Sequence, residues 1–257
     1  MELLSDLKTL YQLAAKPVRG RSHAERLESF YGGQASGYDR FRQRLLHGRR
    51  ELWAAIPVPQ GGVWVDMGGG TAQNLEHFGD GIGELKKVYV VDLCPSLLAV
   101  ARQRVQQRGW TNVELVEADV TTFQPPEGSV DVVTFSYSLT MIPDWFAAVE
   151  QAHQLLRPGG RIGVVDFYVS RKHPRAGMRR HGGWTRTFWP AWFARDNVFL
   201  SADHLPFLQR HFTSLHFEEH RAGLPYVPLA RVPYYTFVGQ RNGDVGGMDG
   251  QCPDPTR

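Results

Sequence analysis

The stretch VWVDMGGGTAQNLEHF, residues 63–78, places three successive glycines between a predicted buried strand and a predicted helix. Glycine loses more backbone freedom on folding than any other residue, so three in a row weaken a fold unless the turn requires them. Asp66 stands just before them, near the end of the predicted strand. In a parallel sheet the loop after the first strand lies closest to a bound ligand, so this loop predicts a ligand site.

Strand-like segments recur on both sides of this loop. They are rich in valine and aromatic residues, are bounded mostly by Gly, Pro or Asn, and cover 62–67, 87–93, 112–120, 129–138, 160–169, 215–221 and 232–241. Helix-like segments separate the earlier ones, and this alternation is typical of parallel sheets covered on both faces. The sequence therefore predicts an α/β, Rossmann-like fold with a seven-stranded, mostly parallel sheet and helices on both faces.

Two of the helices have clear start signals. The first is predicted over 95–109, with Pro95 in its first turn and a glycine just past its end. The second is predicted over 144–160, with Asp144 as the N-cap and with Phe146, Val149 and Leu156 on its buried face.

One domain is predicted over 25–241, with an amphipathic extension over 1–24 before it and a disordered tail over 242–257 after it. Residues 171–210 are predicted as an insertion on the substrate side of this domain, and 171–200 as irregular. No apolar run is long enough to cross a bilayer, and the first residues do not resemble a secretion signal. The two cysteines do not suggest a disulfide framework, so we expect a cytoplasmic protein.

Three kinds of ligand are candidates for the glycine loop. A nucleoside triphosphate site needs Gly-x-x-x-x-Gly-Lys-Ser/Thr, which is absent, and a dinucleotide site needs a glycine where Gln73 stands. A loop for S-adenosylmethionine needs an acid followed by alternating small residues, and Asp66, Gly68, Gly70 and Ala72 supply this pattern. Asp66 can meet the ammonium of such a cofactor. A glycine-rich turn without a ligand is the alternative.

Two further acids follow the second and third predicted strands. Asp92 lies where a carboxylate can accept both ribose hydroxyls, a feature that also suits NAD. Asp119 lies where a carboxylate can accept from an adenine amino group, with Val120 beside it, although Asp119 could instead cap a helix. The loop and both acids resemble class I S-adenosylmethionine-dependent methyltransferases. The predicted cofactor residues are Asp66, Gly68, Gly70, Asn74, Asp92, Leu93, Asp119, Val120 and Ser136.

The loop after the fourth predicted strand, FSYSLTMIPDW at 135–145, narrows the choice of methyl acceptor. It lacks the Asn/Asp-Pro-Pro-Tyr motif of enzymes that methylate amino groups of nucleic acid, and it lacks a Pro-Cys nucleophile. Its first part, Ser136-Tyr137-Ser138, also lacks the acidic residues that would bind a polyamine. We therefore expect a small-molecule or lipid acceptor and no nucleic-acid partner.

Four blocks, at 30–50, 135–145, 188–208 and 225–239, resemble the diacylglycerylhomoserine N-methyltransferases of betaine-lipid synthesis. The resemblance implies three successive methyl transfers to the amine of a homoserine ether-linked to diacylglycerol. It also implies a separate aminocarboxypropyl transferase that supplies the substrate. Ala72 departs from the family, which often has glycine there. The alternatives are another acceptor, such as phosphatidylethanolamine or a quinone ring, or a protein that binds S-adenosylmethionine without catalysis.

Aromatic side chains are the candidates for positioning the acceptor, because their faces stabilise a quaternary ammonium. Tyr31, Tyr38 and Tyr137 belong to segments predicted to flank the reacting sulfonium. We assign no general base, and the histidines show no spacing typical of a metal site.

A lipid acceptor implies work at a membrane surface without spanning it. Two segments could dock the protein there: 1–16, with a stripe of leucines on one helical face, and 171–180, with five Lys/Arg and no acid. A lid on the fold and a solvated loop are the respective alternatives.

Overall fold

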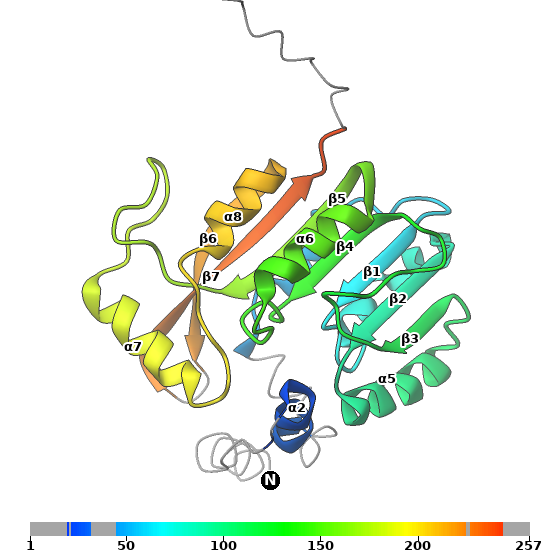
Figure 1. Cartoon of the computed structure of the whole chain (residues 1–257), viewed down its shortest axis with the longest axis horizontal. Coiled ribbons are helices and arrows are strands. Elements are labelled where there is room, and N and C mark those ends of the chain that lie inside the picture. Colours follow the sequence, from blue (N-terminus) through cyan, green and yellow to red (C-terminus); the bar gives the residue numbers. More distant parts are fainter. Residues whose placement is uncertain (1–19, 21, 32–44, 225–226, 244–257) are drawn as a thin grey trace, which may run out of the picture.

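The computed structural model describes residues 20, 22–31, 45–224 and 227–243, and these contain a seven-stranded sheet (Figure 1). The strand order is β3-β2-β1-β4-β5-β7-β6. The strands are β1 (Val63–Met67), β2 (Lys87–Asp92), β3 (Val113–Glu117), β4 (Val130–Ser136), β5 (Leu156–Phe167), β6 (Thr213–Leu224) and β7 (Val227–Gln240). Neighbours among β1–β5 pair in parallel, whereas β7 is antiparallel to both β5 and β6. The predicted seven-stranded, mostly parallel sheet is confirmed.

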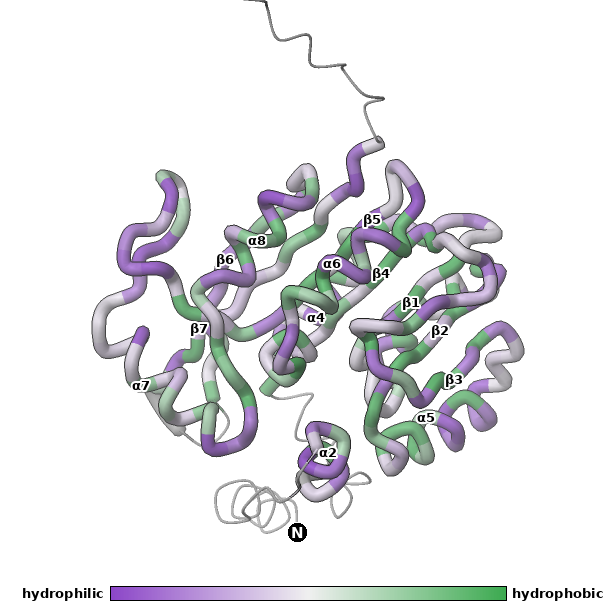
Figure 2. Tube along the Cα trace, in the orientation of Figure 1, coloured by the Kyte–Doolittle hydropathy of each residue, from purple (hydrophilic) through white to green (hydrophobic). Residues whose placement is uncertain are grey.

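Helices cover both faces of this sheet. They are α2 (His23–Tyr31), α4 (Arg49–Ala54), the 3-10 helix η1 (Gln73–Glu84), α5 (Pro95–Arg108), α6 (Trp145–Leu155), α7 (Gly183–Ala194) and α8 (His204–His211). Buried side chains of α6 and α8 pack against one face, and those of α4, η1, α5 and α7 pack against the other. Figure 2 shows the hydrophobic residues concentrated along the strands between these two layers.

The start of α6 follows the prediction, but its end does not. The Asp144 carboxylate caps the helix by accepting from the Ala147 N–H at 3.1 Å. The helix ends at Leu155, and Leu156 already has extended backbone and opens β5. The predicted helix over 144–160 is therefore too long. The physical reason is Pro158, which disfavours helical backbone at the residue before it and cannot donate to a helix.

The predicted buried face of this helix is also partly wrong. Phe146 is 43% exposed, and Trp145 takes the buried position instead. The two rings stack with centroids 3.7 Å apart, so Phe146 lies over Trp145 on the outside. Val149 and Leu156 are buried as predicted, although Leu156 belongs to β5.

The predicted irregular segment 171–200 is wrong, because it contains the helix α7. Gly182 and Gly183 at its start and Pro190 inside it are loop signals in sequence. Burial of Trp189 and Phe193 against the sheet stabilises the helix in spite of them.

The limits of the predicted extension and tail are not tested. The predicted boundary at residue 24 lies inside α2, and the amphipathic segment 1–16 lies outside the described residues. Within the described ranges, no helix is long and apolar enough to cross a membrane.

Candidate cofactor site

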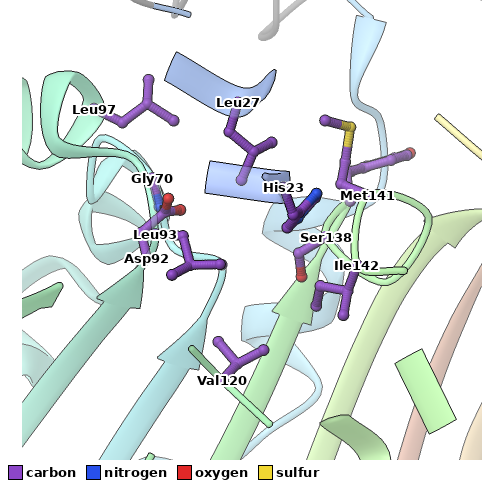
Figure 3. A pocket seen from close by; sticks show the side chains of 12 residues that line it. His23, Leu27, Gly70, Asp92, Leu93, Leu97, Val120, Ser138, Met141 and Ile142 are labelled. Carbon is purple, nitrogen blue, oxygen red and sulfur yellow. The ribbon is translucent and has the colours of Figure 1, made fainter. Parts of the chain in front are cut away.

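A pocket of about 510 Å³, including its open mouth, lies at the carboxyl ends of β1, β2 and β4, under α2 (Figure 3). This is the edge at which a parallel sheet binds its ligands. The described residues that line it are His23, Leu27, Gly68, Gly70, Asp92, Leu93, Leu97, Val120, Tyr137, Ser138, Met141 and Ile142.

Gly68 opens the glycine loop and has a backbone that only glycine adopts without strain. Its φ is +71°, and a Cβ there would lie 2.5 Å from the Cβ of Ser138. Its N–H donates to the Val91 carbonyl at 2.8 Å, which fixes the loop to β2. The glycine is therefore required both by the turn and by the close approach of Ser138.

Asp92 ends β2 and holds the other side of the loop. Its carboxylate accepts from the Gly70 N–H and from the Cys94 N–H, both at 2.9 Å, and the side chain is 8% exposed in the pocket wall. A carboxylate offers about four acceptor sites, which is enough for two backbone groups and the hydroxyls of a ribose. Asp92 thus shapes the loop and presents a negative group to the ligand.

Asp66 lies behind the loop rather than in the pocket wall. It is fully buried and accepts from the Thr134 hydroxyl at 2.8 Å and from the Asn74 amide at 3.1 Å. The Arg49 guanidinium donates to the Asn74 carbonyl at 3.4 Å and to Gln73 at 3.2 Å. This chain of contacts links α4 to the loop. This role of Arg49 was not predicted from the sequence, because a basic residue in a basic segment is usually solvated.

Ser136 and Asn74 are buried neighbours of the loop that do not line the pocket. The Ser136 hydroxyl has no hydrogen-bond partner among the described residues. Direct contact of Asp66, Asn74 and Ser136 with the cofactor stays a prediction.

Val120 lines the pocket, but Asp119 does not. The Asp119 carboxylate is exposed and accepts from the N–H and hydroxyl of Thr121 at 2.8 and 2.7 Å. It therefore caps a turn after β3, and not a helix, which was the alternative role for this residue. The negative charge of Asp119 acts to raise the pKa of His23, against the larger effect of burial. Because His23 lines the pocket, Asp119 lies near that pocket. A contact with adenine stays a prediction.

Tyr137 follows β4 and lines the pocket. Its φ is +54°, its side chain is 5% exposed, and its hydroxyl donates to the His47 carbonyl at 2.7 Å. Its ring meets Phe167 edge-on, with centroids 4.6 Å apart. Burial raises the pKa of Tyr137 well above 10, so the phenol stays neutral. Tyr31 ends α2 and Tyr38 lies outside the described residues, so their role stays a prediction.

A buried carboxylate holds the loop after Tyr137 in place. Asp166, fully buried at the end of β5, accepts from the Thr140 N–H at 3.1 Å and from the Thr140 hydroxyl at 2.8 Å. Burial raises the pKa of Asp166 to about 7. Because Met141 and Ile142 line the pocket, Asp166 positions part of its wall.

His23 and Leu27 of α2 line the pocket, and the sequence did not predict them as site residues. A capping box marks the start of this helix: the Ser22 hydroxyl accepts from the Glu25 N–H at 3.1 Å. The Ser22-x-x-Glu25 spacing of this capping box is visible in the sequence. Burial lowers the pKa of His23, and its buried Nδ1 has no partner among the described residues.

The pocket fits S-adenosylmethionine better than a phosphate-bearing cofactor. No Lys or Arg is among the described residues that line it, whereas Asp92 presents a carboxylate. A sulfonium and an ammonium suit such a wall, and a pyrophosphate does not. Leu93, Leu97 and Val120 add an apolar surface suited to an adenine ring.

Comparison with known proteins agrees with this chemistry. The sequence profile of the ubiE/COQ5 methyltransferase family matches residues 21–190. The ubiquinone/menaquinone biosynthesis C-methyltransferase UbiE of Escherichia coli strain K12 / DH10B is 29% identical over 163 residues, which cover 61% of this chain and 63% of that protein. The UbiE protein of Shigella boydii gives the same values. The chain thus spans about 63% of the length of these curated relatives.

Solved structures share the fold at low sequence identity. Phosphoethanolamine N-methyltransferase 2 of Haemonchus contortus, in complex with S-adenosyl-L-methionine, has a TM-score of 0.65 and 14% identity, over 87% of this chain and 61% of that one. YcgJ of Bacillus subtilis has a TM-score of 0.60 and 14% identity, over 77% of this chain and 99% of that one.

Proposed function

We propose that this chain, which belongs to the ubiE/COQ5 methyltransferase family, methylates the amine of diacylglycerylhomoserine, with S-adenosylmethionine as the cofactor. The product is the trimethylated betaine lipid. The observation that carries methyl transfer is the glycine loop held by Asp92 over a pocket without cationic lining among its described residues. The lipid acceptor rests on the four sequence blocks that resemble the betaine-lipid enzymes.

When bound, S-adenosylmethionine supplies an activated methyl group on a sulfonium. The protein's own tasks are then to align the acceptor, to exclude water and to receive an unprotonated amine. Asp92 and the loop from Gly68 to Gly70 bind and orient the cofactor. Leu27 of α2 and Ile142 add apolar surface that limits access of water.

Two side chains face the acceptor. The ring of Tyr137 offers an aromatic face, which stabilises positive charge on nitrogen by roughly 0.5–2 kcal/mol. His23 stays neutral because burial lowers its pKa, and its Nδ1 can accept a hydrogen bond or a proton from the acceptor. Figure 3 places His23 beside Ser138 and Met141, on the same side as the loop that follows β4.

A second candidate function is carbon methylation of a quinol ring. It is favoured by the curated relatives, which are named C-methyltransferases of ubiquinone and menaquinone biosynthesis. Carbon methylation requires removal of a proton from the ring or its hydroxyl, which His23 could accept. Nitrogen methylation also requires that the amine lose a proton before each of the three transfers, but the amine can release that proton to water before the methyl group moves. The carbon reaction therefore depends more strongly on a base such as His23.

A lipid acceptor also requires a membrane-surface partner. Each buried methylene holds a lipid in the bilayer by about 0.8 kcal/mol, so the protein must come to the lipid. The basic run at 171–180 is exposed over most of its length and is a candidate for this contact. Arg171 in this run is paired with Asp203 at 2.6 Å, which leaves the later residues as the stronger candidates.

Lipid mass spectrometry after co-expression with an aminocarboxypropyl transferase tests the proposal. Mono-, di- and trimethylated homoserine lipids are expected with the wild-type chain, and at much lower levels with Asp92→Ala. Accumulation of unmethylated diacylglycerylhomoserine with the wild-type chain, together with methylation of the quinone pool, would favour the second candidate.

A further inference from the structure

α7 presents large aromatic side chains to solvent as well as to the sheet. Its inner residues Trp189 and Phe193 are buried against the sheet. On the outside, Trp184 is 77% exposed and Trp192 is 47% exposed, with Phe188 partly exposed between them. Because α7 lies at the surface (Figure 1), exposed aromatic side chains on it indicate an interaction surface.

The outer residues form one continuous aromatic row at the spacing of successive helical turns. The rings of Trp184 and Phe188 stack with centroids 5.2 Å apart and planes 13° apart, and the Phe188 and Trp192 centroids are 5.6 Å apart. Phe199, just after the helix, is 55% exposed. Three of the five exposed large hydrophobic side chains in the described residues thus fall in or just after α7: Trp184, Trp192 and Phe199, as against Phe146 and Leu215 elsewhere.

Positive charge lies near the start of this row. Residues 171–200 contain seven Lys/Arg and a single acid, Asp196. Arg179, Arg186 and Arg221 all act on His181, just before α7, and contribute with burial to lowering its pKa to about 4. These arginines therefore gather near the start of the helix. Figure 2 shows the segment that leads into α7 as largely hydrophilic.

We propose that the outer face of α7, formed by Trp184, Phe188 and Trp192, seats on an anionic bilayer surface and docks the enzyme to its lipid substrate. Tryptophan rings partition to the boundary between headgroups and acyl chains, and arginines near them attract anionic headgroups. The aromatic row therefore suits the bilayer interface, and the nearby arginines suit its anionic headgroups. The inference deepens the proposed function and rests on it for the identity of the substrate.

The docked helix lies next to the side of the pocket that Tyr137 lines. Phe193 packs on Phe167 with ring centroids 4.9 Å apart, and Phe167 in turn contacts Tyr137 of the pocket wall. The Phe199 N–H donates to the Thr140 carbonyl at 2.7 Å, which joins the segment after α7 to the pocket loop. α7 also lies at the end of the sheet where α2 covers the pocket (Figure 1). A lipid headgroup at α7 is therefore close to the reacting position.

Vesicle flotation tests the inference. The full chain, Trp184→Ser/Trp192→Ser and the control Leu215→Ser are mixed with phosphatidylcholine vesicles, with and without phosphatidylglycerol. Leu215 lies on β6 and is 49% exposed, so it matches the exposure but not the position of the aromatic row. We expect the double variant to bind anionic vesicles about tenfold more weakly than the wild type and the control to bind equally well.

Two results would overturn the inference. The first is binding of the double variant that equals the wild type. The second is sedimentation that shows a wild-type dimer dissolved by the same substitutions, with vesicle binding unchanged, since the row would then be an interface between copies of the chain. Titration with S-adenosylmethionine separates docking from the proposed function: the double variant is expected to keep wild-type affinity, and absence of cofactor binding in the wild type would refute the proposed function alone.

Discussion

The Asp92 carboxylate accepts a hydrogen bond of 2.9 Å from the N–H of Gly70, across 22 residues of chain. This contact joins the end of β2 to the glycine loop after β1. It means that the residue predicted to bind the ribose also fixes the shape of the loop beside it. Loss of Asp92 therefore affects the site in two ways, and variants at this position test the site most directly.

Asp92→Ala is expected to lower the affinity for S-adenosylmethionine by about tenfold or more. Hydrogen bonds to a charged group contribute about 1.5–3 kcal/mol each, and the variant removes the group that accepts them. Calorimetric titration measures the effect, with Asp80→Ala on η1 as a control in which an exposed acid is removed. Wild-type affinity in Asp92→Ala would exclude Asp92 from the cofactor site.

Gly68→Ala is expected to destabilise the fold by roughly 2 kcal/mol or more, because the residue has a left-handed backbone and its new Cβ would meet Ser138. The free energy of unfolding in urea measures this. Gly83→Ala is the control, since a Cβ there meets nothing within 4 Å. Adding Ser138→Gly to Gly68→Ala should recover part of the loss; no recovery would mean that backbone strain alone is responsible.

Asp166 is expected to make the protein less stable as the pH rises from about 4 towards 7. Burial raises its pKa from 3.8 to about 7, so over this range the folded protein keeps a proton that the unfolded chain has lost. The stabilisation is fully present below about 3.8 and is lost as the pH rises through about 7.

Comparison with Asp166→Asn isolates this effect. Burial lowers the pKa of His204 to about 3, which makes stability rise with pH over much of the same window and masks the wild-type trend. The difference in unfolding free energy between the wild type and Asp166→Asn should fall between pH 4 and pH 7. Parallel pH profiles would show that Asp166 has an ordinary pKa.

Tyr137 is expected to act on the acceptor through its ring and on stability through its hydroxyl. Tyr137→Phe removes the donor to the His47 carbonyl, so stability should fall by about 1 kcal/mol while the rate of methylation stays near the wild type. Tyr137→Ala removes the aromatic face as well, and the rate should fall further. Steady-state kinetics with the lipid acceptor measure both variants; a slow Tyr137→Phe would assign the role to the hydroxyl instead.

The sheet and the helices α5 and α6 were predictable because their local sequence signals and their burial favour the same structure. Runs of valine at β1, β2 and β4 are buried on both faces, and Pro95 and Asp144 begin α5 and α6 where expected. α7 was missed because Pro190 and the glycines before it are loop signals, whereas tertiary burial of Trp189 and Phe193 decides its structure.

The cofactor loop was predictable in type, but the partners of its polar residues were not. The spacing of Asp66, Gly68 and Gly70 indicates the loop, and Gly68, Gly70 and Asp92 do meet in one pocket. The fully buried position of Asp66 and the role of Asp119 as a cap depend on the neighbours Thr134 and Thr121. Such contacts arise from the packing of distant strands or from local turn geometry, which spacing in sequence does not specify.

The most direct test of the central claim is a competition among acceptors. Purified chain is incubated with methyl-labelled S-adenosylmethionine and with vesicles that contain diacylglycerylhomoserine, phosphatidylethanolamine and a demethylated quinol, and each lipid is then separated and counted. The account predicts label in the homoserine lipid, passing through mono- and dimethyl forms to the trimethylated product. With Asp92→Ala, at a cofactor concentration below the wild-type Kd, it predicts about tenfold less label. Label confined to the quinol or to phosphatidylethanolamine, with the homoserine lipid unlabelled, would contradict it.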